Sequence, residues 1–82
     1  MIALPAGVWV WLASGATDMR KGFDGLVALV QTQLAEDAYS GQLFAFRGKA
    51  GDRVKILWFS GDGLCLFAKR LGRGRLVWPS TY

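Results

Sequence analysis

The stretch LFAFRGKAGDRVKILWFSGDGLCLFAKR, from Leu43 to Arg70, decides the fold because short apolar runs alternate in it with glycine-rich separators. The runs are rich in β-branched and aromatic side chains, which favour strands. The separators GKAGD and SGDG supply glycines where tight turns need positive φ, and Asp62-Gly63 is a strong turn pair. These patterns predict strands at Leu43–Arg47, Arg53–Phe59 and Leu64–Arg70.

The same pattern continues toward the C-terminus. A further separator, LGRG at Leu71–Gly74, precedes the short run Arg75–Trp78, which predicts a fourth strand. Four strands joined by tight turns make an antiparallel meander.

A helical pattern precedes the meander. Apolar residues recur at spacings of three and four, which lines one face of a helix. Thr17 or Asp18 can cap the start of this helix by accepting hydrogen bonds from its free N–H groups, and Glu36–Gly41 reads as a loop. The predicted apolar stripe consists of Phe23, Leu26, Val27, Val30 and Leu34.

A first strand is predicted at Val8–Leu12 (VWVWL), before the helix. We expect the helix to pack on the sheet and this strand to join it at an edge. The 82 residues are therefore expected to form a single small α+β domain with the order β-α-β-β-β-β.

Alternation along the strands predicts which side chains share a face. We expect one face to pack against the helix, formed by Phe44, Phe46, Val54, Ile56 and Trp58. The opposite face would then carry Arg47, Arg53 and Lys55, extended by Lys49 from the turn.

Two aspects of this assignment stay open. Leu57 and Phe59 would share the basic face, so that end of the sheet needs a cover from the first strand, a partner or further chain. The face of Lys69 depends on strand register, which the sequence leaves open.

The charge is unevenly distributed along the chain. The net charge is +4, but residues 1–42 carry two basic and four acidic residues, whereas residues 43–82 carry eight basic and two acidic ones. Such asymmetry favours a surface for a polyanion, and cations there would neutralise backbone phosphates. The predicted nucleic-acid-binding residues are Arg47, Lys49, Arg53, Lys55, Lys69, Arg70, Arg73 and Arg75.

Plainer explanations exist for these residues. A basic surface also serves solubility, and edge strands often carry Lys or Arg to block aggregation, which applies most directly to Lys69 and Arg70. An exposed aromatic side chain could stack on an unpaired base, but tryptophans in strands more often belong to a core or interface. The four tryptophans concerned are Trp9, Trp11, Trp58 and Trp78.

The sequence offers little for catalysis or metal binding. It has no histidine and a single cysteine, Cys65, which excludes a disulfide framework and a Cys/His zinc site. Asp18, Asp24, Asp52 and Asp62 show no spacing typical of a magnesium site, so we expect no catalytic residue, metal or cofactor. No stretch reaches the roughly 20 apolar residues of a membrane helix. We expect a cytoplasmic, nucleoid-associated protein.

Several longer strings carry a family resemblance. TDMRKGF, FRG, GDxxKxLW and LFxKRLxRGR followed by WP occur in this order between Thr17 and Pro79. Together they make the chain similar to the accessory proteins called TnpB or Orf2-like from the IS66 group of bacterial insertion sequences. The resemblance implies a role in transposition beside a separate transposase that cuts DNA. Relatives usually continue past the WP pair, so we expect the chain to lack their C-terminal tail.

Two functions remain in competition. The first is a non-catalytic subunit that binds DNA, with the transposon ends as the expected target. The second is a module that docks on the element's transposase without direct DNA contact, in which case the apolar surface matters most. The expected partners are DNA, the transposase and another accessory protein, with no membrane, and self-association is left open. A metal-dependent nuclease is a third, disfavoured reading.

Overall fold

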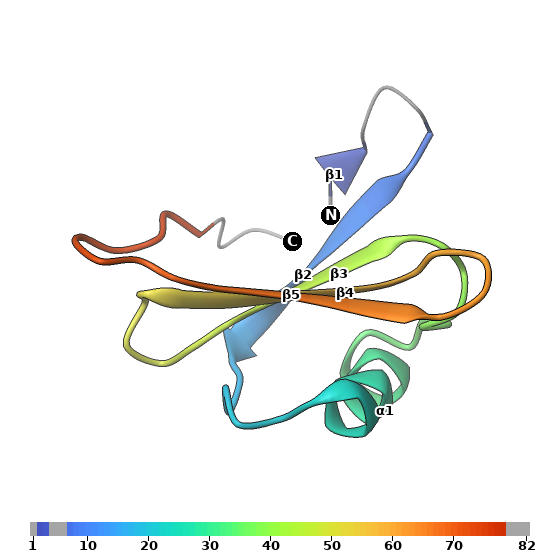
Figure 1. The fold of residues 1–82 in the computed structure, drawn as a ribbon, viewed down its shortest axis with the longest axis horizontal. Coiled ribbons are helices and arrows are strands. Elements are labelled where there is room, and N and C mark those ends of the chain that lie inside the picture. Colours follow the sequence, from blue (N-terminus) through green and yellow to red (C-terminus); the bar gives the residue numbers. More distant parts are fainter. Residues whose placement is uncertain (1, 4–6, 79–82) are drawn as a thin grey trace.

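The computed structural model describes residues 2–3 and 7–78 (Figure 1). One helix lies on one side of a five-stranded sheet whose strand order follows the chain. The elements are β1 (Ile2–Ala3), β2 (Trp9–Ala16), α1 (Phe23–Gln33), β3 (Leu43–Arg47), β4 (Arg53–Phe59) and β5 (Leu64–Arg70).

The antiparallel meander β3-β4-β5 confirms three predicted strands with their predicted bounds. The fourth predicted strand, Arg75–Trp78, is wrong. The N–H groups of Leu71 and Leu76 donate to the carbonyl oxygens of Asp52 and Gly51, both at 2.7 Å. The chain therefore folds back around the β3-β4 turn and forms no new rung of the sheet.

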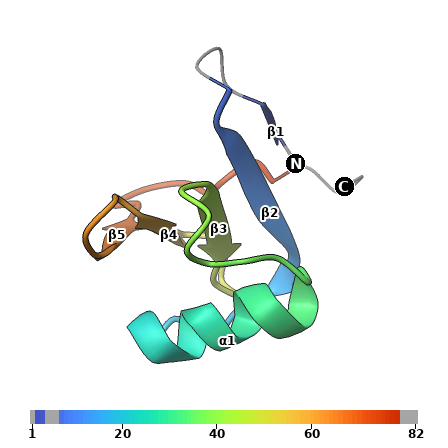
Figure 2. The same ribbon diagram turned by 90° about the vertical axis from the view of Figure 1, so that its right-hand side faces the viewer.

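The prediction of a wholly antiparallel meander with an added edge strand is also corrected, because the sheet is mixed. β2 pairs with β3 in parallel, and β1 covers the far side of β2 in an antiparallel pair. Parallel neighbours need a crossover connection, which α1 supplies between the end of β2 and the start of β3 (Figure 2). The α+β character is retained, with one βαβ unit at the N-terminal end.

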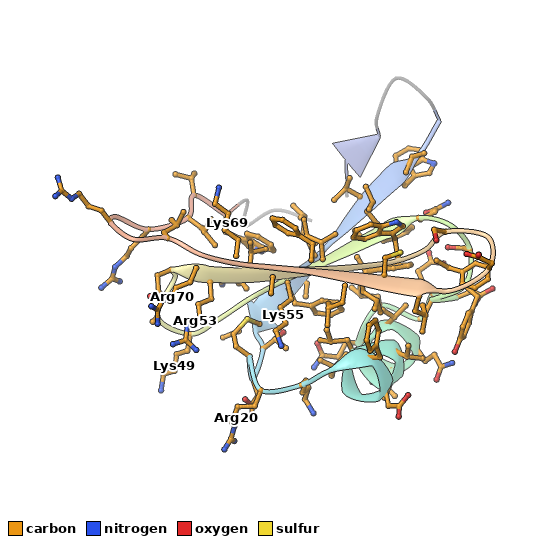
Figure 3. All side chains as sticks on the ribbon, in the orientation of Figure 1. Arg20, Lys49, Arg53, Lys55, Lys69 and Arg70 are labelled. Carbon is orange, nitrogen blue, oxygen red and sulfur yellow. The ribbon has the colours of Figure 1, made fainter. Side chains whose placement is uncertain are left out.

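The predicted assignment of faces is reversed on β4. Phe44 lies directly opposite Leu57, and Phe46 opposite Lys55, so the odd-numbered residues of β4 lie on the side of α1. Val54, Ile56 and Trp58 therefore lie on the other side, which we call the open face. Figure 3 shows Lys55 on the helix side and Lys69 on the open face. The prediction for β4 is therefore wrong, because both of its faces carry apolar residues and alternation does not say which one the helix covers.

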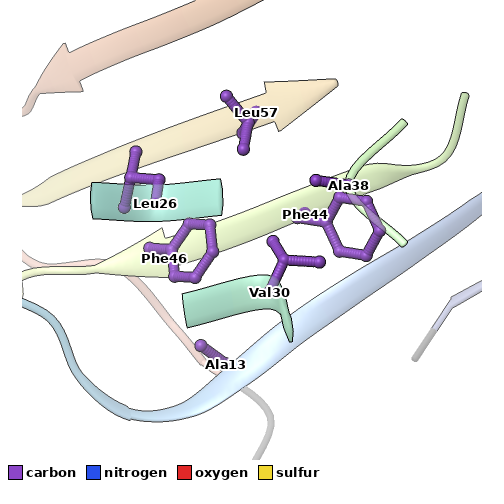
Figure 4. Close-up of a cluster of buried hydrophobic side chains, with 7 residues drawn as sticks. All are labelled: Ala13, Leu26, Val30, Ala38, Phe44, Phe46 and Leu57. Atoms are coloured by element: carbon purple, nitrogen blue, oxygen red, sulfur yellow. The ribbon is translucent and has the colours of Figure 1, made fainter. Parts of the chain in front are cut away.

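The core lies between α1 and the sheet (Figure 4). Leu57 is fully buried there, and Phe59 contacts Tyr39 edge-on with ring centroids 5.5 Å apart. The cover needed by Leu57 and Phe59 thus comes from α1 and the loop after it. The buried residues of this core cluster are Ala13, Leu26, Val30, Ala38, Phe44, Phe46 and Leu57.

The helix follows its predicted stripe except at its start. Leu26 and Val30 are buried, whereas Phe23 remains 46% exposed. Gly22 occupies the N-cap position without a side-chain hydrogen bond, so the predicted cap by Thr17 or Asp18 is wrong. Asp18 instead accepts hydrogen bonds from Arg20, and both residues precede the helix.

Candidate nucleic-acid interface

Two arginines face each other where β4 begins and β5 ends. Arg53 and Arg70 are directly opposed in the antiparallel pair, and both are exposed on the helix side. Like charges in directly opposed positions destabilise a sheet. Among the residues that the structure describes, the only ion pair joins Arg20 to Asp18, so neither Arg53 nor Arg70 has a carboxylate partner there. This arrangement favours a bound anion.

A hollow of about 390 Å³ lies beside these arginines. Arg53, Lys55 and Arg70 belong to its helix-side wall. Lys69 also borders the hollow, but its side chain lies on the open face. No acidic residue of the described chain lines it. Its remaining lining comes from the apolar residues Met19, Val54 and Ala68.

A second hollow of about 380 Å³ shares Met19 and Arg53 with the first. It lies between the segment that follows β2 and the turn between β3 and β4. Arg20, Lys49 and Arg53 supply its cations, while Asp18 and Asp52 supply two carboxylates. We call the two adjoining hollows the basic groove.

Local packing holds the groove in place. The Nζ atom of Lys55 donates to the backbone carbonyl oxygen of Lys21 at 2.8 Å, which ties β4 to the turn before α1. Met19 packs against Gly48 so closely that a Cβ atom at Gly48 would lie 2.8 Å from its Cγ. The side chain of Met19 therefore forms a wall between the two hollows only because residue 48 is glycine.

Arg20 is held at the rim of the second hollow by Asp18. Its Nη2 lies 2.7 Å from Oδ2, its Nε lies 3.0 Å from Oδ1, and its backbone N–H also donates to Oδ1. These hydrogen bonds hold the pKa of Asp18 well below its ordinary value and raise the pKa of Arg20. Both side chains remain exposed to solvent, so the pair orients Arg20 without burying it.

The eight predicted cations do not lie together. Lys49, Arg53, Lys55 and Arg70 gather around the basic groove (Figure 3). Arg47 and Lys69 belong to the open face. The Nη2 atom of Arg47 donates to the carbonyl oxygen of Ser14 at 3.2 Å, and its Nε atom is buried without a partner in the described chain. The expected cluster of Arg47 with Arg53 and Lys55 on one face is therefore wrong.

Arg73 and Arg75 lie in the C-terminal segment beyond β5, and both are exposed. The side chain of Arg75 lies over Gly51, which adopts a positive φ of 79° in the β3-β4 turn. The segment then reaches β2, where the indole N–H of Trp78 donates to the carbonyl oxygen of Ala13 at 3.0 Å. These contacts place the segment beside the turn that carries Lys49.

Sequence reasoning missed Arg20 as a member of the groove. It belongs to the acidic half of the chain, so a charge count along the sequence separated it from the other cations. Its position in TDMRKGF could have indicated this role, because Asp18, two residues earlier, can hold the Arg20 guanidinium in place by hydrogen bonds.

No group of three or more acidic or cysteine side chains suited to a metal ion occurs among the described residues. The carboxylate of Asp18 forms an ion pair with Arg20. The thiol of Cys65 lies 3.4 Å from the hydroxyl oxygen of Ser60, within hydrogen-bond distance. None of the described helices is long and apolar enough to cross a membrane.

Comparison with known proteins connects this arrangement to a family. The profile of the IS66 Orf2 like proteins matches residues 8–82, which includes every cation of the groove. The chain belongs to this family. Membership implies a transposition-associated accessory role.

Two relatives from Sinorhizobium fredii, both named as uncharacterized proteins, extend the comparison. The protein y4hO is 53% identical over 80 residues, which cover 95% of this chain and 70% of the relative. The protein y4jC is 38% identical over 79 residues, covering 96% of this chain and 68% of the relative. No solved structure matches the chain significantly.

Proposed function

We propose that this IS66 Orf2-like protein is a non-catalytic accessory subunit that binds DNA through the backbone phosphates. The observation that carries the proposal is the opposed pair Arg53 and Arg70, beside a hollow that no described acidic residue lines. Folding brings these cations together at a cost, and a phosphate offsets that cost by supplying the missing negative charge. The proposed target is the DNA at the ends of the element.

The proposed contacts centre on the helix side of the sheet. Arg53, Lys55 and Arg70 line the first hollow, and Lys49 and Arg20 line the second. Arg73 and Arg75 would extend the surface along the adjoining C-terminal segment. The side chains of Arg47 and Lys69 fall outside it, because they lie on the open face. No aromatic side chain of the described residues lines either hollow, which favours phosphate contact over base stacking.

A pair of neighbouring residues provides a matched test. Arg70→Glu and Lys69→Glu change the net charge equally, but the two side chains lie on opposite faces of β5. Binding to element-end DNA and random DNA would be measured across a salt series. We expect Arg70→Glu to weaken binding and to lower the slope of affinity against salt by about 1, the change expected for one phosphate contact. Lys69→Glu should have a much smaller effect.

The outcome separates surface contact from bulk charge. Equal losses for the two variants would show that net charge, and not the groove, determines binding. No binding by the unaltered protein at low salt would overturn the proposal. A preference for element ends over random DNA would add sequence recognition to phosphate contact.

Docking on the transposase remains a second candidate, now supported by a different surface. Leu57 and Phe59 are covered from within the chain, but the open face carries Ile56 and Trp58 in half-buried positions and Phe67 with 47% of its surface exposed. Apolar contacts of this kind are not screened by salt. Capture of the transposase that survives high salt and is abolished in Phe67→Glu would favour docking.

A further inference from the structure

Within residues 2–3 and 7–78, no strand pairs with the outer edge of β5. β5 is the last strand of the sheet, and its seven residues pair with β4 without a shift in register. The backbone bonds from Ser60 to Gly63 and from Leu71 to Asp52 fall at the two ends of this ladder. Because an antiparallel ladder alternates, the even-numbered residues of β5 direct their N–H and C=O groups away from β4. These outward residues are Leu64, Leu66, Ala68 and Arg70.

Only the C-terminal end of this edge carries a feature that prevents pairing, the charges of Lys69 and Arg70. Natural edge strands are often shortened, bulged, interrupted by proline or covered. β5 contains no proline, and its charges are confined to its last two residues, Lys69 and Arg70. Phe67, in its middle, is 47% exposed.

Charge at the two ends of β5 identifies the partner. The turn before the strand carries Asp62, whereas Arg70 and Arg73 lie at and after its C-terminal end. If two copies of β5 pair antiparallel about Phe67, Leu64 lies opposite Arg70, and the Asp62 turn of each copy lies beside Arg70 and Arg73 of the other. A parallel pair would instead align like charges. The edge is thus complementary to itself in one direction.

We propose that two copies of this protein associate through antiparallel pairing of their β5 strands, centred on Phe67. In this register Leu66 and Ala68 of each copy form hydrogen-bonded pairs across the interface. The two Phe67 side chains then face each other in a non-hydrogen-bonded pair, where side chains approach most closely. The interface is isologous, as a two-fold dimer requires.

The arrangement has one consequence for the basic groove. Two-fold pairing of edges places both α1 helices, and hence both grooves, on the same side of the joined sheet. The meaning of this arrangement for DNA rests on the proposed DNA contact. The self-association itself does not rest on that contact, and it is tested without DNA.

Sedimentation equilibrium of the purified chain, from micromolar to millimolar concentration, tests the dimer. We expect a reversible monomer–dimer equilibrium, and we expect Phe67→Glu to weaken it by about tenfold or more, because the substitution sets two like charges opposite each other and removes the aromatic pair. Val77→Glu is the matched control, since Val77 is 97% exposed and lies outside β5. It should leave the equilibrium unchanged.

A charge exchange tests the direction of pairing independently of Phe67. Asp62→Arg should weaken the dimer, and combining it with Arg70→Glu and Arg73→Glu should restore it. Circular dichroism would verify that each variant is folded. If Phe67→Glu does not fold, the charge exchange still tests the proposal. A wild-type protein that stays monomeric at millimolar concentration, or an exchange that fails to restore association, would overturn the proposal. Either result is compatible with DNA binding by a monomer.

Discussion

Arg53 and Arg70 lie directly opposite each other at the end of the β4-β5 pair, both exposed and both on the side of α1. In the next pair on the same face, Lys55 lies opposite Ala68, so a small apolar side chain sits among the cations around the hollow. Folding therefore concentrates positive charge where no described carboxylate forms an ion pair with either arginine. Two opposed arginines do not stabilise the fold, so a bound external anion explains their arrangement better.

Removing one member of this pair should stabilise the protein. We expect Arg70→Gln to raise the free energy of unfolding by about 0.2–1 kcal/mol at low ionic strength, because the variant no longer sets two like charges opposite each other. Added salt should stabilise the unaltered protein more than the variant, since salt screens the repulsion. Urea unfolding at two salt concentrations measures both effects. Lys69→Gln is the control, because Lys69 lies opposite Val54, and an equal gain there would contradict the explanation.

Gly48 should resist even the smallest substitution. A Cβ atom at this position would lie 2.8 Å from Cγ of Met19, so Gly48→Ala displaces the wall between the two hollows. We expect a decrease of about 1–3 kcal/mol in the free energy of unfolding, as for other overpacked sites. Denaturant unfolding gives the change in midpoint.

Two further variants separate this contact from a general effect of replacing glycine. Gly15→Ala should have little effect, because nothing lies within 4 Å of an added Cβ and its φ is not positive. Met19→Ala should suppress most of the cost of Gly48→Ala in the double variant, since it removes the clashing atoms. Additive decreases in stability would show that the cost arises elsewhere.

The strands of the meander could be predicted with their bounds because each depends on local pattern. Leu43–Arg47, Arg53–Phe59 and Leu64–Arg70 are short apolar runs bounded by glycine-containing turns, and nothing distant overrides them. Arg75–Trp78 has a similar composition, yet the hydrogen bonds of Leu71 and Leu76 to the β3-β4 turn direct the chain elsewhere. The parallel pairing of β2 with β3 likewise depends on packing between distant segments.

The candidate site could be predicted by charge but not by position. All the cations of the first hollow were identified from the basic half of the chain, yet their distribution between two faces follows from the register of Phe44 with Leu57. Periodicity identifies alternate faces without saying which one the helix covers. Arg20 came from a segment with net negative charge, where only its proximity to Asp18 marked it out.

The ion pair of Asp18 with Arg20 predicts a specific response to pH. The pKa of Asp18 is lowered by the hydrogen bonds from Arg20, so its contribution to stability is complete above the unfolded value of about 3.9 and disappears only as pH falls toward the lower folded value. Carboxyl chemical shifts followed by NMR should show Asp18 titrating below an ordinary aspartate. In Arg20→Gln the pKa should return toward the ordinary range. An ordinary value in the unaltered protein would contradict the observed geometry.

The C-terminal segment predicts how far the DNA surface extends. Leu71 and Leu76 are both anchored to the β3-β4 turn, so the loop with Arg73 leaves from and returns to that turn, and Arg75 packs over Gly51 of the same turn. If DNA occupies the groove, both arginines are placed to contact phosphates that continue from it. Replacing both with glutamate should weaken DNA binding and lower the slope of affinity against salt by about 2, one for each phosphate that the arginines no longer neutralise.

The control for this pair is a double variant that also makes the chain more acidic, at one side chain on the open face and at one residue beyond Arg75. Lys69→Glu combined with Val77→Glu alters exposed positions outside the groove-facing cations, and it should change the slope much less. Fluorescence anisotropy with a labelled duplex over a salt series measures all the slopes under one protocol. Unchanged affinity after reversal at Arg73 and Arg75 would confine the DNA surface to the groove itself. Weaker binding without any change in slope would point to a disturbed fold, because a phosphate contact cannot be removed without reducing the release of counterions.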